Sequence, residues 1–131
     1  MTEKQENILA AIFEQIAERT KMVFADIVLE ADPKVVIEKI LHLPFDIDQS
    51  EYRQWRLMYA MKWQMNTYNS SKMDPLKMAA KNAFEKLGYK EAEAESEILL
   101  MLLNGAATAM LLQELPHKQT VLQTLKSKYN L

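Results

Sequence analysis

The sequence predicts an all-α fold of about six helices, arranged as a single domain over residues 1–131. Two glycines and four prolines in 131 residues leave little material for the tight turns that strand-rich folds need. Apolar residues recur at steps of three and four, and no segment shows the alternation of a half-buried strand. A chain of this length buries roughly two-thirds of its unfolded surface, which suffices for one hydrophobic core.

Two helices are predicted in the first third of the chain. Thr2 and Gln5 have the spacing of a capping box, so the first helix should begin near residue 3. Its apolar stripe continues unbroken to about residue 29. Asp32-Pro33 then supplies an N-cap and a proline at the first helical position. This second helix should stop before Pro44, because the residue preceding a proline disfavours the helical conformation.

Two further helices are predicted in the middle of the chain. The third should run from about 49 to 69, beginning at a second capping-box spacing between Asp48 and Glu51. Asp74-Pro75 opens the fourth helix after a short polar loop. Gly88 should close that helix in the left-handed conformation that glycine adopts without strain.

The stretch Glu91–Leu115 is predicted to be the fifth helix. Four glutamates occupy every second position at its start, where negative charge suits the positive end of the helix dipole. From Ile98 to Leu112 the stretch is almost wholly apolar. Pro116 ends it or begins a new turn, and a last helix follows over 117–129.

A helix that is apolar on nearly all sides must be covered on more than one side. At about 100° of rotation per residue, one face holds Ile98, Met101, Leu102, Gly105, Ala109 and Leu112. A second face, about 120° away, holds Leu99, Leu103, Ala106 and Met110. One face can pack on the chain's own core, and the other needs another surface, most simply a second copy of the chain. We therefore expect a homodimer.

Composition sets limits on function. Sixteen basic and eighteen acidic residues give a net charge of −2, so no broad nucleic-acid-binding surface is expected. The absence of cysteine excludes disulfides and zinc–thiolate sites. The polar N-terminal residues do not resemble a signal peptide, and the apolar run at 98–112 is shorter than the eighteen or so residues that span a bilayer. We expect a cytoplasmic protein that makes no use of a membrane.

Catalytic and metal-binding patterns are weak. Glu114 and His117 match the Glu-x-x-His spacing of di-iron bundles, but Pro116 interrupts the helix and no second copy of the motif exists. Glu38 and His42 lie four residues apart on one helix face, where they could meet a metal or each other, but a solvated pair near a helix end is the more ordinary arrangement. The alternating glutamates at the start of the fifth helix point to different sides, whereas a catalytic pair must converge. We expect no enzyme, no catalytic residue, no metal and no cofactor.

The third predicted helix is rich in methionine and aromatic residues. They are Tyr52, Trp55, Met58, Tyr59, Met61, Trp63, Met65 and Tyr68. Methionine adapts its shape, and tryptophan and tyrosine carry polar ends that need partners, which suits a pocket for a flat or elongated apolar ligand. Arg56 and Lys62 would add a polar anchor. The alternative is that these residues belong to an ordinary core.

Three features in order form a recognisable pattern: Leu87-Gly88, the acidic start at Glu91–Glu97, and a leucine-rich run that reaches Asn104-Gly105. This pattern resembles the C-terminal half of TetR-type transcriptional regulators, and the resemblance extends over essentially the whole chain. It implies that the last two helices form a four-helix bundle across a two-fold axis. Leu122 and Leu125 would then join the dimer interface.

The same resemblance implies that the middle helices enclose a small apolar or aromatic effector, whose binding shifts DNA-reading heads. The expected pocket residues are Phe13, Ile16, Thr20, Trp55, Met58, Tyr59, Lys62, Met65 and Phe84. The family's N-terminal helix-turn-helix domain is expected to be absent from this chain, which would then be a fragment more readily than a natural headless protein. DNA would be bound only through that domain. The alternative function is a stand-alone helical interaction module that binds another protein's helix through the Gly105 face.

Overall fold

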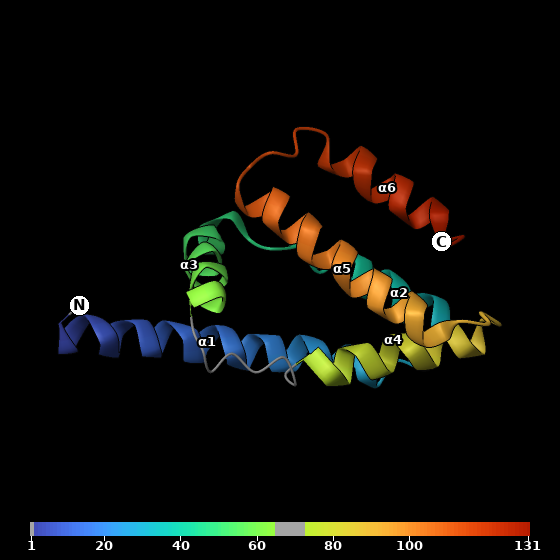
Figure 1. Ribbon diagram of the computed structural model, residues 1–131, viewed down its shortest axis with the longest axis horizontal. Helices are drawn as coiled ribbons and strands as arrows, with labels where there is room; N and C mark the ends of the chain where they lie inside the picture. Colours follow the sequence, from blue (N-terminus) through green and yellow to red (C-terminus); the bar gives the residue numbers. More distant parts are fainter. Residues whose placement is uncertain (1, 65–72) are drawn as a thin grey trace.

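The computed structural model describes residues 2–64 and 73–131, apart from the side chains of residues 6, 9, 13 and 61–64 (Figure 1). Within the described residues it contains six α-helices, one short 3-10 helix and no strand, which confirms the predicted all-α fold of about six helices. The elements are α1 (Glu3–Val28), α2 (Pro33–His42), η1 (Gln49–Glu51), α3 (Tyr52–Gln64), α4 (Asp74–Lys86), α5 (Ala92–Leu111) and α6 (Lys118–Lys128).

The first two helices begin where the sequence predicts. The Gln5 backbone N–H donates to the Thr2 hydroxyl at 3.2 Å, and the Thr2 N–H donates to the Gln5 side chain at 2.9 Å. The predicted capping box is therefore confirmed. At α2, the Lys34 N–H donates to the Asp32 carboxylate at 3.0 Å, and Pro33 occupies the first helical position. Both starts satisfy backbone donors that would otherwise lack a partner.

The start of the third helix differs from the prediction. Asp48 accepts a hydrogen bond from the Ser50 N–H at 2.9 Å and opens the 3-10 turn η1, so α3 itself begins only at Tyr52. No capping box forms, because the Glu51 carboxylate turns elsewhere. It pairs with Arg19 of α1 and accepts a hydrogen bond from the Trp55 indole N–H at 3.3 Å. The predicted end of this helix at residue 69 lies outside the described residues.

Three helices end in the same six-to-one hydrogen bond. It joins the Tyr89 N–H to the Phe84 carbonyl at 3.0 Å after α4, and equivalent bonds of 2.9 Å follow α5 and α6. Each has a left-handed residue in the turn, namely Gly88 (φ 89°), Gln113 (φ 57°) and Asn130 (φ 60°). The predicted cap at Gly88 is confirmed. The predicted extension of the fifth helix to residue 115 is wrong, because the left-handed turn at Gln113 ends it first.

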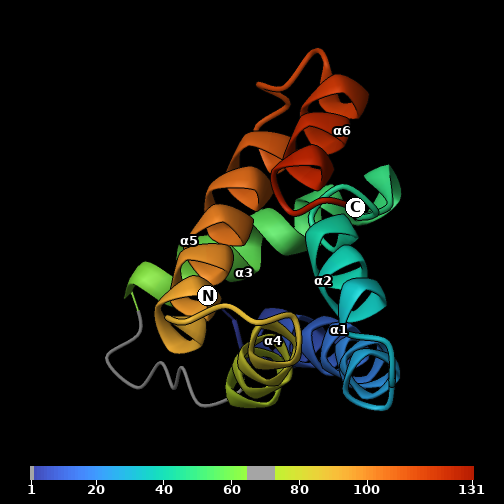
Figure 2. The same ribbon diagram turned by 90° about the vertical axis from the view of Figure 1, so that its right-hand side faces the viewer.

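The main hydrophobic core lies between α2, α4 and α5, with Ile27 of α1 at its edge. Fully buried side chains from these helices meet there, including Ile40, Leu41, Leu76, Phe84 and Leu99. In the ribbon views α4 lies alongside α1, and α5 crosses above them (Figures 1 and 2). The N-terminal half of α1 extends beyond this core (Figure 1).

A second, smaller core joins the start of α3 to the C-terminal half of α5 and to α6. Its buried members are Phe45, Tyr52, Met110, Leu111 and Leu122. The α6 helix is also tied to α2 by an ion pair of 3.1 Å between Lys126 and Glu38. Consequently α6 folds back along α5 with its apolar side turned inward (Figure 2).

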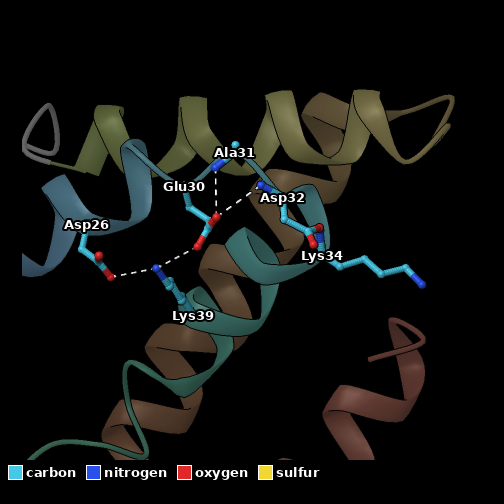
Figure 3. A network of polar contacts seen from close by, with 6 residues as sticks. All are labelled: Asp26, Glu30, Ala31, Asp32, Lys34 and Lys39. Carbon is cyan, nitrogen blue, oxygen red and sulfur yellow. Dashed lines mark hydrogen bonds and ion pairs between the residues drawn. The ribbon is translucent and has the colours of Figure 1, made fainter.

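The corner between α1 and α2 is held by a polar network (Figure 3). The Lys39 ammonium lies 3.0 Å from Asp26 and 3.1 Å from Glu30, so α2 is tied to the last turns of α1. Glu30 also accepts hydrogen bonds from the backbone N–H groups of Ala31 and Asp32, at 3.0 and 3.3 Å. The hydrogen bond from Lys39, followed by that from the Asp32 backbone, holds the pKa of Glu30 below its ordinary value.

Candidate interaction face on α5

The two faces that the sequence assigns to the fifth helix have opposite environments. Leu99 and Leu103 on one face are buried in the main core, and Met110 is buried in the second core. The other face is open to solvent. We call it the outer α5 face, and it consists of Ile98, Met101, Leu102, Gly105, Ala109 and Leu112. The helix therefore uses only one of its apolar sides within the chain.

The outer α5 face is unusually exposed for its composition. Met101 is 70% exposed, Leu112 54% and Ile98 48%, whereas Leu99 on the inner side is 0% exposed. Single exposed apolar residues are common on soluble proteins, but a continuous stripe along four turns of one helix is typical of an interaction site. This stripe is the strongest candidate for a functional surface in the described part of the chain.

Small residues occupy the middle of the outer α5 face. A Cβ atom added at Gly105 would meet no atom within 4 Å, so the chain itself leaves this position open. Ala109 lies one turn further along the same face, and it is half-buried. Small side chains at i and i+4 form a shallow depression into which a second helix can pack closely.

Polar groups border one side of this face. Glu97 pairs with Lys77 of α4 at 3.1 Å, which also joins the two helices. Further along, the Thr108 hydroxyl donates to the Asn104 carbonyl at 2.9 Å. An apolar centre with a polar border is the usual arrangement of a protein–protein interface.

The expected contribution of α6 to the dimer interface needs correction. Leu122 is only 4% exposed and packs in the second core, and Leu125 is half-buried against both cores. The outward residues of α6 are polar, namely Gln119, Thr120, Gln123, Thr124, Ser127 and Lys128. Both leucines face the chain's own core because α6 must cover Met110 and Leu111 at the end of α5.

The residues predicted for a ligand pocket are divided among several environments. Phe84 is fully buried in the main core, where its ring contacts Tyr89 edge-on at a centroid distance of 4.9 Å. Phe84 thus packs within the main core of the described residues. Trp55 and Tyr59 lie at the second core, so the structure does not bring them together with Phe84.

Other members of that set lie on α1 and α3. Ile16 is buried, and Thr20 and Met58 are half-buried. The side chains of Phe13 and Lys62, and all of Met65, lie outside the described residues. A groove of about 580 Å³ runs along α1, but its described lining is a more polar set: Ala11, Glu14, Gln15, Glu18 and Arg19. A ligand pocket between α1 and α3 therefore remains a prediction.

One polar group near α1 was not anticipated from the sequence. The side-chain oxygen of Gln54 is buried and has no hydrogen-bond partner within the described part of the chain. Gln54 lies in the first turn of α3, three residues after Glu51 of η1, which pairs with Arg19 of α1. Buried polar oxygens normally have a partner, so Gln54 is an exception among the described residues.

The structure also bears on metals and membranes. Across residues 2–64 and 73–131, no three histidine or acidic side chains cluster as metal ligands would. In the same residues α5 is the one helix long and apolar enough to cross a membrane by length and composition, with a mean hydropathy of 1.2. The observed helix is longer than the apolar run at 98–112 because it includes Ala92 to Glu97. The core helix of a soluble protein meets the same criterion, and one side of α5 is indeed core.

Comparison with known proteins finds no match for this chain. No family model matches the chain, and neither the curated proteins nor the solved structures contain a significant match. Functional interpretation therefore depends on the outer α5 face and on the packing around it.

Proposed function

We propose that this chain is the effector-sensing and dimerisation domain of a TetR-like transcriptional regulator, acting in the cytoplasm as a homodimer and without catalytic activity. The observation that carries the proposal is the outer α5 face, an exposed apolar stripe centred on Gly105. The order of the helices and the Leu87-Gly88 turn before the acidic start of α5 support the same family.

A second copy of the chain is the simplest partner for this face. In a two-fold dimer the same patch is used by both subunits, so it must be complementary to itself. The face meets this condition when Gly105 lies near the axis, because the depression at Gly105 and Ala109 can receive the larger residues of the partner. Burial of Ile98, Met101 and Leu112 in this way stabilises each subunit through the hydrophobic effect.

A two-fold axis perpendicular to the two α5 helices pairs them in antiparallel directions. With Gly105 at the axis, a residue n positions before it within α5 would lie opposite the residue n positions after it on the partner helix. Met101 would then lie opposite the small side chain of the partner's Ala109.

The proposed effector is a small apolar or aromatic molecule between α1 and α3. The methionine and aromatic content of α3 supports this, together with the unpartnered buried oxygen of Gln54. An effector would act by binding one arrangement of these helices more tightly than another. Its own polar group would then pair with Gln54.

Two measurements test the two halves of the proposal separately. Light scattering after size-exclusion chromatography at micromolar concentration should give a mass near 30 kDa, twice the 15.2 kDa of one chain; a monomer would rule out dimerisation through the outer α5 face. The fluorescence of Trp55 and Trp63 should change saturably with some members of a panel of apolar aromatic and cationic compounds. No response across that panel would remove the sensing function and leave the dimer intact.

The second candidate function is a stand-alone helical interaction module. It is favoured by the polar outer side of α6, since a four-helix bundle normally draws apolar residues from both helices of each subunit. Such a module would bind an amphipathic helix of another protein in the Gly105 depression. The purified chain would then be monomeric alone and would gain mass only with that partner.

A further inference from the structure

A crevice lies beside the second core, where α5 passes into α6. It has a volume of about 270 Å³ and is formed by two segments distant in sequence, the entry to α3 and the turn after α5. In Figure 1 the entry to α3 and the turn after α5 both lie near the C-terminal end of α5. The volume is slightly below that of pockets for drug-sized ligands, so a smaller molecule is indicated.

The polar residues of this crevice carry hydrogen-bond donors. Gln49 and Gln113 have amide N–H groups, Tyr52 has a hydroxyl, and Lys118 has an ammonium group. Lys118 is the sole charged residue among the described residues that line the crevice. Two acidic side chains at the entry to α3 are engaged elsewhere, because Asp48 accepts a hydrogen bond from the Ser50 N–H and Glu51 pairs with Arg19.

The remaining lining residues are apolar and include Ile47, Met110 and Leu115. Met110 is buried, and it belongs to the second core together with Tyr52. The crevice thus has an apolar floor and donors at its rim. This combination suits a molecule with a compact apolar body and one group that accepts several hydrogen bonds.

Gln113 adopts a conformation that is costly for its residue type. Its φ of 57° is left-handed, and it occupies the turn position that glycine fills after α4. A side chain with a Cβ is less stable in this conformation than glycine is. Gln113 therefore lies at the crevice in a conformation in which glycine would be more stable. Strained positions of this kind concentrate at ligand sites.

The start of α6 adds positive potential. Its first residue is Lys118, its first turn holds no acidic residue, and its N-cap His117 makes no side-chain capping hydrogen bond. The first turn of α6 therefore supplies no negative charge to the positive end of its helix dipole. An acidic ligand group in the crevice would provide one.

From these observations we propose that the crevice between η1 and the α5–α6 turn binds a small organic carboxylate. The carboxylate accepts hydrogen bonds from Lys118, Gln113 and Gln49, and the apolar body rests on Ile47 and Met110. The site is separate from the outer α5 face and from the proposed effector position beside Gln54. It does not depend on the proposed regulatory function.

Benzoate, its neutral isostere benzamide, and inorganic phosphate are suitable probes, and backbone amide chemical shifts measured by NMR are a suitable readout. Benzoate should shift the amides of Gln113, Lys118 and Tyr52 with a dissociation constant on the order of millimolar. Benzamide should bind at least about tenfold more weakly, because it lacks the charge. Phosphate should also bind more weakly than benzoate, because it lacks the apolar body.

Two lysine variants distinguish benzoate binding in the crevice from a general effect of the protein's positive charge. Lys118→Met should weaken benzoate about five- to tenfold. Lys128→Met removes the same charge from the exposed end of the same helix and should leave the affinity unchanged. Equal loss in both variants, equal binding of benzoate and benzamide, tighter binding of phosphate, or no saturable shift at these amides would each overturn the proposal. A folded amide spectrum for Lys118→Met confirms that lost binding reflects the missing charge.

Discussion

Replacing Gly105 by leucine should have opposite effects on the stability of one chain and on the association of two chains. Within the chain the new side chain has space, since no atom lies within 4 Å of a Cβ at this position. Leucine also has a higher helix propensity than glycine, so the substitution should stabilise α5 by about 0.8 kcal/mol. The free energy of unfolding of one subunit should therefore rise slightly.

In the proposed dimer the same substitution introduces bulk where two helices approach most closely. Overpacking a well-fitted contact costs about 1–3 kcal/mol, and a two-fold axis applies that cost twice. A total of about 2–6 kcal/mol weakens association by a factor of about 30 or more, since about 1.4 kcal/mol corresponds to tenfold. At micromolar concentration this should convert a dimer into a mixture or a monomer.

Sedimentation velocity across a concentration series, paired with circular dichroism, measures both effects. Two matched variants serve as controls. Gly105→Ala raises helix propensity without bulk and should stay dimeric. Asn104→Leu adds the same side chain on an exposed neighbouring position about 100° away around the helix and should also stay dimeric. A fully dimeric Gly105→Leu protein would refute the choice of face, and a loss of helicity would refute the open space at Gly105.

Three further predictions concern the fold itself. Gln113→Gly should raise the free energy of unfolding by about 1 kcal/mol in urea titrations, because it relieves the left-handed turn; a decrease would contradict the strain argument. Leu99→Ala should lower that free energy by about 2–5 kcal/mol, because the side chain is fully buried, and a loss below 1 kcal/mol would contradict the core packing. Lys39→Met should destabilise the protein most between the ordinary pKa values of glutamate and lysine. The difference should fade as acid protonates Glu30 through its lowered pKa and as alkali deprotonates Lys39 through its raised pKa, which hydrogen bonds to Asp26 and Glu30 cause. Lys34→Met is the matched control, since this ammonium points away from the network (Figure 3), and an equal effect of both variants at all pH values would contradict the account.

The positions of the helices and of their first residues follow from local rules that can be applied to the sequence alone. Thr2 with Gln5, Asp32 with Pro33, and Gly88 each predict a cap, and all three are found. The division of α5 into an inner and an outer face also follows from periodicity, because Leu99 and Ile98 differ by 100° around the helix. Local chemistry is sufficient in these cases, since every interaction lies within one or two turns.

Features that depend on distant contacts could not be predicted. Glu51 has capping-box spacing but pairs with Arg19, which is 32 positions earlier in the chain. Gln113 adopts a conformation that favours glycine, so no propensity rule marks it as the end of α5. Leu122 has the same character as an interface leucine, and only the way α6 folds back shows that it is buried. A buried oxygen at Gln54 likewise has no sequence signal.

The central claim is that two chains meet through the outer α5 face near a two-fold axis. Because the natural chain has no cysteine, a single introduced cysteine can form a disulfide only with a second copy. Oxidative cross-linking should be compared for cysteines placed singly at Ile98, Leu102, Gly105 and Ala109, and at Gln123 on the polar side of α6. The two-fold arrangement predicts rapid, near-complete cross-linking at Gly105, where the Cα atoms of the two copies can approach within about 7 Å, and little at Gln123. Cross-linking at all four α5 positions that is no faster than at Gln123 would contradict the interface.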